Sequence, residues 1–180
     1  MIIGITGTDG AGKGTVVDYL VSQHGFTHYS SRDLIVAEIE RRGLPSDRNH
    51  MRLVANDLRA THGNAVIVKR ALEHALAEQK DLAVIESIRA LDEALYLKEN
   101  GGILLAIDAD PRVRYARVQA RRSATDQVTY EQFIAHEELE KNDPDPHGMQ
   151  KAKVMEMADY TINNTASVAE LQAAVDEFLA

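Results

Sequence analysis

The stretch GTDGAGKGT, residues 7–15, decides how the rest of this sequence is interpreted. It follows residues 2–6, a short apolar and β-branched run that is typical of a buried strand. It overlaps the start of residues 14–24, where apolar residues recur at the spacing of a helix. A G-x-x-x-x-G-K sequence between a strand and a helix is the pattern of a phosphate-binding loop, or P-loop. We therefore expect a site for the phosphates of a nucleotide at this first strand–helix junction.

The chemistry of phosphate binding accounts for the residue types in this loop. Glycines let the backbone wrap closely round an anion with its N–H groups turned inward, and the helix start adds the positive end of its dipole. Lys13 supplies a mobile positive charge for the β- and γ-phosphates, and Thr15 supplies a hydroxyl one residue later than the general pattern. The candidate ATP-binding residues of the loop are Gly7, Asp9, Gly10, Ala11, Gly12, Lys13, Gly14 and Thr15.

Strands and helices alternate along the remaining sequence. Further strands are expected at residues 26–30, 82–85, 103–108 and 160–163, with helical segments between them. This order predicts an α/β protein with the three-layer sandwich of P-loop NTPases and a five-stranded parallel sheet. We interpret residues 1–180 as a single domain, in which ligands bind outside the carboxyl ends of the strands.

Several helix boundaries can be predicted from local signals. We expect Asp110, which is followed by proline, to be the N-cap of a helix. Thr129 and Ser167 each open a capping box with Gln or Glu three residues later. A helix over residues 64–79 is indicated by an apolar stripe that includes Leu76.

The composition narrows the classes of function. A formal net charge of -8 argues against a nucleic-acid polymer as partner, because phosphate backbones require a basic surface. The lack of cysteine removes disulfide scaffolds, thiolate nucleophiles and Cys-ligated zinc. With no secretory signal and no membrane-spanning run, a cytoplasmic protein without a membrane partner is expected. The 13 arginines, against 7 lysines, indicate either a local anion site or an arginine-rich solvated surface.

The loop also carries a family resemblance. Residues 10–15, GAGKGT, resemble the G-x-G-K-G-T loop of adenylate kinases, and residues 8–13, TDGAGK, resemble the D-G-x-G-K loop of thymidylate kinases. Both belong to the nucleoside monophosphate kinase group. The resemblance implies ATP and Mg²⁺ as cofactors, with Thr15 near phosphate and Mg²⁺ and Asp9 facing the acceptor nucleotide.

Two segments resemble the acceptor side of these kinases. Residues 30–35, SSRDLI, resemble the T-G-D-L-x-R segment, although Arg32 replaces its glycine and Val36 its arginine. Residues 86–89, ESIR, resemble the D-G-x-P-R segment whose arginine grips the acceptor phosphate, and Glu86 could hold a Mg²⁺-bound water. The acceptor-binding region is expected over residues 31–80, where three arginines could line one side of a helix. The candidate substrate-binding residues are Asp9, Ser31, Arg32, Arg48, Arg52, Arg59, Glu86 and Arg89.

The lid side shows a third similarity. Residues 117–122, RVQARR, resemble the R-x-x-x-R-R run that leads into the lid of adenylate kinases. This resemblance implies that Arg117 lies against the ATP adenine and Arg121 near the transferring phosphoryl group, with a short lid over residues 121–130. The candidate catalytic residues are therefore Lys13, Arg89, Arg117 and Arg121, and the metal-binding candidates are Thr15 and Glu86.

Three functions are compatible with these features. The first is phosphorylation of a nucleoside or deoxynucleoside monophosphate. The second is another small-molecule kinase, chiefly a dephospho-coenzyme A kinase. Residues 157–164 resemble the C-terminal end of those kinases. The third is a nucleotide-binding switch, although the N-K-x-D motif of guanine-specific switches is missing. These features do not identify the base or the sugar of the acceptor, and they do not distinguish a monomer from a homodimer.

Overall fold

A computed structural model describes residues 1–121 and 128–180, and the side chain of Arg48 lies outside the described part. The central sheet has five parallel strands in the order β2-β3-β1-β4-β5. The strands are β1 (Ile2–Gly7), β2 (Thr27–Ser30), β3 (Ala83–Glu86), β4 (Ile103–Asp108) and β5 (Tyr160–Asn163). The α/β class and the five-stranded parallel sheet are confirmed.

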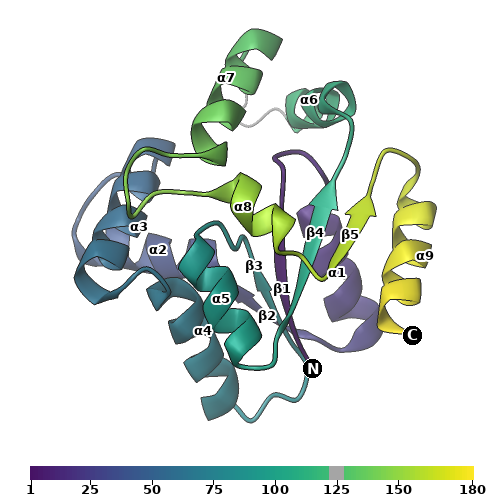
Figure 1. Ribbon diagram of the computed structural model, residues 1–180, viewed down its shortest axis with the longest axis horizontal. Helices are drawn as coiled ribbons and strands as arrows, with labels where there is room; N and C mark the ends of the chain where they lie inside the picture. Colours follow the sequence, from purple (N-terminus) through teal and green to yellow (C-terminus); the bar gives the residue numbers. More distant parts are fainter. Residues whose placement is uncertain (122–127) are drawn as a thin grey trace.

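Helices cover both faces of the sheet, so the molecule has three layers (Figure 1). On one face, α1 (Lys13–His24) and α9 (Val168–Leu179) share a core with the strands, in which Leu20 and Val175 pack with Ile5. The other face is covered by α4 (Val66–Ala77), α5 (Leu91–Glu99) and α8 (Lys151–Glu156). Burial on both faces explains why the strands are continuous apolar runs.

The remaining helices surround the carboxyl ends of the strands. α2 (Ser31–Arg41) and α3 (Arg48–His62) form a smaller core with the start of α4, centred on Ile39, Leu58 and Ile67. α6 (Pro111–Ala120) and α7 (Tyr130–Lys141) stand on the other side of the P-loop (Figure 1). None of the helices in the described ranges is long and apolar enough to cross a membrane.

The predicted helix starts are confirmed. The carboxylate of Asp110 accepts hydrogen bonds from two amides of the first turn of α6. Thr129 and Ser167 both form complete capping boxes, at the starts of α7 and α9. These caps orient α6 and α7 above the strand ends, because they satisfy the amides that a helix start leaves free.

The prediction for Leu76 is wrong. The buried side of α4 passes through Leu72 and Ala75, whereas Leu76 is 70% exposed. Leu76 follows Ala75 by one residue, and one residue turns a helix by about 100°, away from the core. The apolar stripe read from the sequence was therefore wider than the face that α4 buries.

Candidate functional site

The backbone of the P-loop adopts the form that its glycines permit. Gly10 and Gly12 have φ angles of +80° and +100°, a region that favours glycine. A Cβ at Gly12 would lie 2.4 Å from the side-chain nitrogen of Asn164, and one at Gly10 would lie 2.6 Å from the carbonyl oxygen of Arg114. Close packing on both sides therefore fixes the path of the loop from β1 into α1.

Lys13 lies inside this loop. Its Nζ donates hydrogen bonds to the carbonyl oxygens of Gly7, at 3.0 Å, and Thr8, at 2.8 Å. It also lies 3.9 Å from a carboxylate oxygen of Asp9. Burial lowers the pKa of Lys13 to about 7, with Lys151 and Arg89 adding to the effect and Asp9 opposing it. The charge of this lysine therefore depends on its surroundings near neutral pH.

One cleft of about 620 Å³ runs along the P-loop. It lies at the carboxyl ends of the strands, where ligands of parallel α/β sheets bind. The structure brings together here most of the predicted site residues from five separate segments. The predicted residues that line the cleft are Asp9, Gly10, Gly12, Lys13, Gly14, Thr15, Ser31, Arg32, Arg52, Arg59, Glu86, Arg89 and Arg121.

Other predicted residues are placed differently. Gly7 and Ala11 belong to the loop but do not line the cleft, and neither does Arg117. The side chain of Arg48 and residues 122–127, which include most of the predicted lid, fall outside the described residues.

The arginines on the acceptor side have different partners. Arg59 is buried and forms an ion pair with Glu93 at 2.9 Å. Arg52 pairs with Asp143 at 3.2 Å. Arg89 instead approaches the sulfur of Met149, at 3.7 Å, and within the described residues it forms no ion pair shorter than 4.0 Å. Arg89 is thus the best placed of these three to receive an anion without breaking an existing pair.

Arg117 fastens α6 to the far side of the P-loop. Its guanidinium donates to the carbonyl oxygens of Asn164, at 2.8 Å, and Ala166, at 3.4 Å. The side chain of Asn164 in turn donates to the carbonyl oxygen of Ala11, at 2.7 Å. The contact between Arg117 and adenine that the family resemblance implies stays a prediction.

Glu86 and Thr15 provide a possible Mg²⁺ site. Glu86 ends β3 and pairs in register with Ile5 of β1, directly before the P-loop. Its carboxylate lies 3.7 Å from a ring nitrogen of His28. The described residues hold no group of three or more His, Cys, Asp or Glu suited to a metal. Mg²⁺ takes only one or two protein ligands beside water and phosphates, so a hydroxyl and a carboxylate on one cleft fit it.

Asp9 is surrounded by cations. Its carboxylate lies 3.0 Å from Nζ of Lys151, which also contacts Glu140. Burial by itself would raise the pKa of Asp9, but Lys151, Lys13 and Arg89 outweigh it and hold that pKa well below its ordinary value. Asp9 is therefore ionised at neutral pH. No local pattern pointed to Lys151 or Glu140, because both come from distant segments that only the fold brings to the loop.

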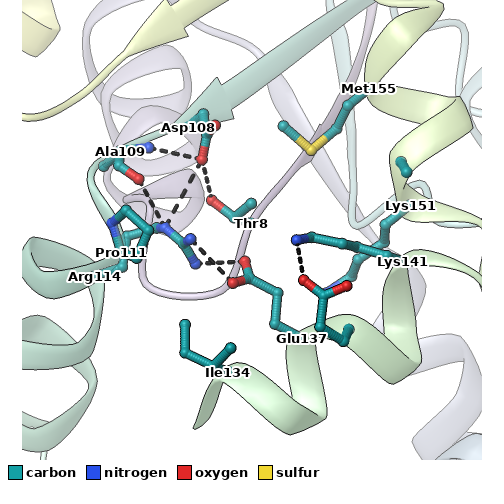
Figure 2. A pocket seen from close by; sticks show the side chains of 12 residues that line it. Thr8, Asp108, Ala109, Pro111, Arg114, Ile134, Glu137, Lys141, Lys151 and Met155 are labelled. Atoms are coloured by element: carbon teal, nitrogen blue, oxygen red, sulfur yellow. Dashed lines mark hydrogen bonds and ion pairs between the residues drawn. The ribbon is translucent and has the colours of Figure 1, made fainter. Parts of the chain in front are cut away.

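A second cavity, of about 440 Å³, lies beside the P-loop between α6, α7 and α8 (Figure 2). Its wall contains a buried pair in which the guanidinium of Arg114 donates to both carboxylate oxygens of Glu137, at 2.6 and 3.1 Å. Thr8 of the loop donates to Asp108 at 2.6 Å. Asp108 could have been suspected from the sequence because it ends a predicted strand. These contacts make the loop part of a wider polar network.

Comparison with known proteins agrees with this architecture. The AAA domain family matches residues 3–144. A UPF0200 protein of Pyrobaculum aerophilum is 30% identical over 181 residues, which cover 99% of this chain and 96% of that protein. A UPF0200 protein of Thermococcus kodakarensis is 30% identical over 185 residues, with the same coverage of 99% and 96%.

Solved structures share the fold over nearly the whole chain. TT1252 from Thermus thermophilus has a TM-score of 0.69 and 24% identity, covering 99% of this chain and 96% of that one. Shikimate kinase from Bacteroides thetaiotaomicron has a TM-score of 0.63 and 16% identity, covering 99% and 98%. The domain therefore has the fold of P-loop kinases.

Proposed function

The chain belongs to the UPF0200 family and to the AAA domain family, and from this premise we propose that it is an ATP-dependent kinase that phosphorylates a nucleoside monophosphate. The kinase-like fold supports phosphoryl transfer as the reaction class. The choice of a nucleoside monophosphate as the acceptor is argued from residues of this chain.

The observation that carries the proposal is the shared cleft of Lys13 and Arg89. Lys13 belongs to the loop that would hold the ATP phosphates, and Arg89, which follows β3, lines the same cleft. Among the described residues Arg89 forms no ion pair shorter than 4.0 Å, so its guanidinium suits the forked recognition of a phosphate oxygen pair. Two cations from different segments would then hold the donor and acceptor phosphates close together.

Phosphoryl transfer asks the protein mainly for positioning and for charge stabilisation. Lys13 would contact the β- and γ-phosphates, and Arg121 at the end of α6 would neutralise charge that develops on the transferring group. Arg89 would orient the attacking phosphate oxygen of the acceptor. Thr15 and Glu86 would hold Mg²⁺, which neutralises charge on the β- and γ-phosphates when it is bound.

A hydroxyl acceptor is the second candidate, as in a dephospho-coenzyme A kinase. The observation in its favour is Asp9, a carboxylate held ionised beside Lys13 in the cleft. An ionised carboxylate can accept a hydrogen bond from an attacking hydroxyl, which a monophosphate dianion does not need. Shikimate kinase, which shares this fold, is named for shikimate, a compound with hydroxyl groups.

The experiment is ADP release from Mg-ATP across a panel of ribo- and deoxyribonucleoside monophosphates, with dephospho-coenzyme A and shikimate added. Turnover on one nucleotide would support the proposal and identify the base and sugar. Turnover on a hydroxyl acceptor alone would favour the second candidate. ATP binding without turnover on any acceptor would contradict both candidates and favour a nucleotide-binding switch. Lys13→Ala serves as the inactive control.

A further inference from the structure

Lys151 is a buried cation that the proposed reaction has not yet used. It is the first residue of α8 and is 5% exposed. Its Nζ lies 3.0 Å from Oδ1 of Asp9 and donates a second hydrogen bond to Glu140. It also borders the second cavity, where Figure 2 shows it behind Lys141. Lys151 lies beyond residues 3–144, the part of the chain that matches the AAA domain family.

Stability alone does not account for such a residue. Removing a lysine from water costs free energy, and a buried ion pair seldom stabilises a fold more than an apolar cluster of equal volume. Apolar side chains in place of Lys151, Asp9 and Glu140 together would pack here without that cost. A lysine here is explained by what its ammonium group does to its neighbours.

The neighbours of Lys151 are the P-loop and the helix that follows the lid region. Asp9 lies within the P-loop, and Glu140 lies on α7. The charged groups that face Asp9 are Lys151 from α8, Glu140 from α7, Lys13 from α1 and Arg89 from the segment after β3. Lys151 therefore joins the P-loop, α7 and α8 through Asp9, which itself lines the cleft.

We propose that Lys151 is a positioning residue of the phosphoryl-transfer site: it fixes the carboxylate of Asp9 in the cleft and fastens the P-loop to α7 and α8. The part of this inference that concerns phosphoryl transfer rests on the proposed function. With Lys151 in place, Asp9 is oriented beside Lys13 and ready to contact the acceptor. Without it, the carboxylate of Asp9 loses a cation 3.0 Å away and still faces the negative charge of Glu140.

The first test needs no substrate. The ¹³C carboxyl signal of Asp9, assigned with Asp9→Asn, is followed by NMR from neutral to acid pH in the full-length protein. In Lys151→Met we expect the pKa of Asp9 to rise by about one unit or more, because an adjacent cation lowers a carboxyl pKa by roughly that amount. Lys151→Arg should keep the pKa low. An unchanged pKa in Lys151→Met would overturn the proposal.

Two further variants serve as controls for this titration. Lys141→Met removes a half-buried lysine of α7 that pairs only with Glu138 among the described residues, and it should leave the pKa of Asp9 unchanged. If Lys151→Met does not fold, Lys151→Met/Glu140→Gln also removes the Glu140 carboxylate, which loses its ion pair with Lys151 in the single variant. A pKa of Asp9 that is as low in that double variant as in Glu140→Gln alone would equally contradict the inference.

The second test uses the acceptor found in the panel. Lys151→Met should lower kcat about tenfold, the scale of losing an outer-shell partner, with the KM for ATP little changed and partial recovery in Lys151→Arg. In an Asp9→Asn background the same change should cost much less. Full additivity would show that Lys151 does not act through Asp9. If no acceptor is found, the proposed function fails, while the titration still decides the link between Lys151 and Asp9.

Discussion

At the level of single residues, the charge on Lys13 depends on what occupies the cleft. In the empty site, burial and the nearby cations lower the pKa of Lys13 to about 7 from an ordinary value of 10.5. Between these two pH values an exposed lysine would carry its proton, but Lys13 has largely lost it. The negative phosphates of a bound nucleotide favour the ammonium form and so raise the pKa of Lys13 again. Nucleotide binding and protonation of Lys13 are therefore linked.

We predict that ATP binding at about pH 8, one unit above the lowered pKa of Lys13, is accompanied by proton uptake of up to about one proton. Calorimetry in two buffers of different ionisation enthalpy measures this uptake directly. It should fall as the pH drops below 7, where Lys13 is already protonated in the empty site. Lys13→Met should abolish the uptake and weaken binding. The same uptake in Lys13→Met would assign the proton to another group.

A second prediction concerns Arg89. We expect Arg89→Ala to raise the KM for the acceptor at least tenfold, because a charge-assisted hydrogen bond to phosphate contributes about 1.5–3 kcal/mol. The Kd for ATP should change far less. Steady-state kinetics and ATP titration measure the two quantities separately. Equal losses in both would assign Arg89 to the donor side of the cleft.

At the level of secondary-structure elements, the caps determine where helices begin. Ser167 accepts from the amide of Glu170 at 3.3 Å, and the carboxylate of Glu170 accepts from the amide and the hydroxyl of Ser167. These bonds fix the start of α9 after the loop that contains Asn164, which also touches the P-loop. The cap of α9 thus helps to hold one wall of the site.

Ser167→Ala should lower the free energy of unfolding by about 1 kcal/mol, the usual effect of removing an N-cap hydroxyl. Urea denaturation measures this change. Ser22→Ala is the matched control, since Ser22 is an exposed residue inside α1. It should be neutral or slightly stabilising because alanine favours helix. An equal loss in both variants would mean that the cap contributes nothing specific.

At the level of the whole molecule, buried ion pairs connect the helical layers around the cleft. Arg59 of α3 and Glu93 of α5 are 3% and 1% exposed. Glu93 also accepts hydrogen bonds from the amides of Arg89 and Ala90, at 3.0 and 3.1 Å. The pair therefore ties the acceptor-side helices to the segment that carries Arg89. Arg59 acts on the site through Glu93 in this arrangement, although its side chain also borders the cleft.

Arg59→Met should lower the free energy of unfolding by about 3–5 kcal/mol, because it leaves the carboxylate of Glu93 buried without its cation. Chemical denaturation provides the measurement. Arg41→Met is the control, since Arg41 is 70% exposed and pairs with Glu38 on the surface. It should cost less than about 1 kcal/mol. A loss of similar size in both variants would contradict a structural role for the buried pair.

Local signals in the sequence were sufficient for the α/β class, the order of elements and the P-loop. Gly10, Gly12 and Lys13 stand together within a few residues, and the caps at Asp110, Thr129 and Ser167 act on their own first turns. Such signals depend on backbone conformation and near neighbours, so they can be recognised before any tertiary contact is known.

Only the tertiary structure decided which charged side chains act together. Asp9 and Lys151 are separated by 142 positions, and Arg59 and Glu93 by 34, yet each pair is in contact. Arg59 and Arg89 are identical in type, but one is paired in the interior and the other borders the cleft without an ion pair shorter than 4.0 Å among the described residues. Burial and partnership set the charge and the role of a side chain, and both arise from the packing of distant segments. Local sequence patterns were therefore enough to predict the fold and the phosphate loop, whereas the electrostatics of the site follow from the packing of distant segments.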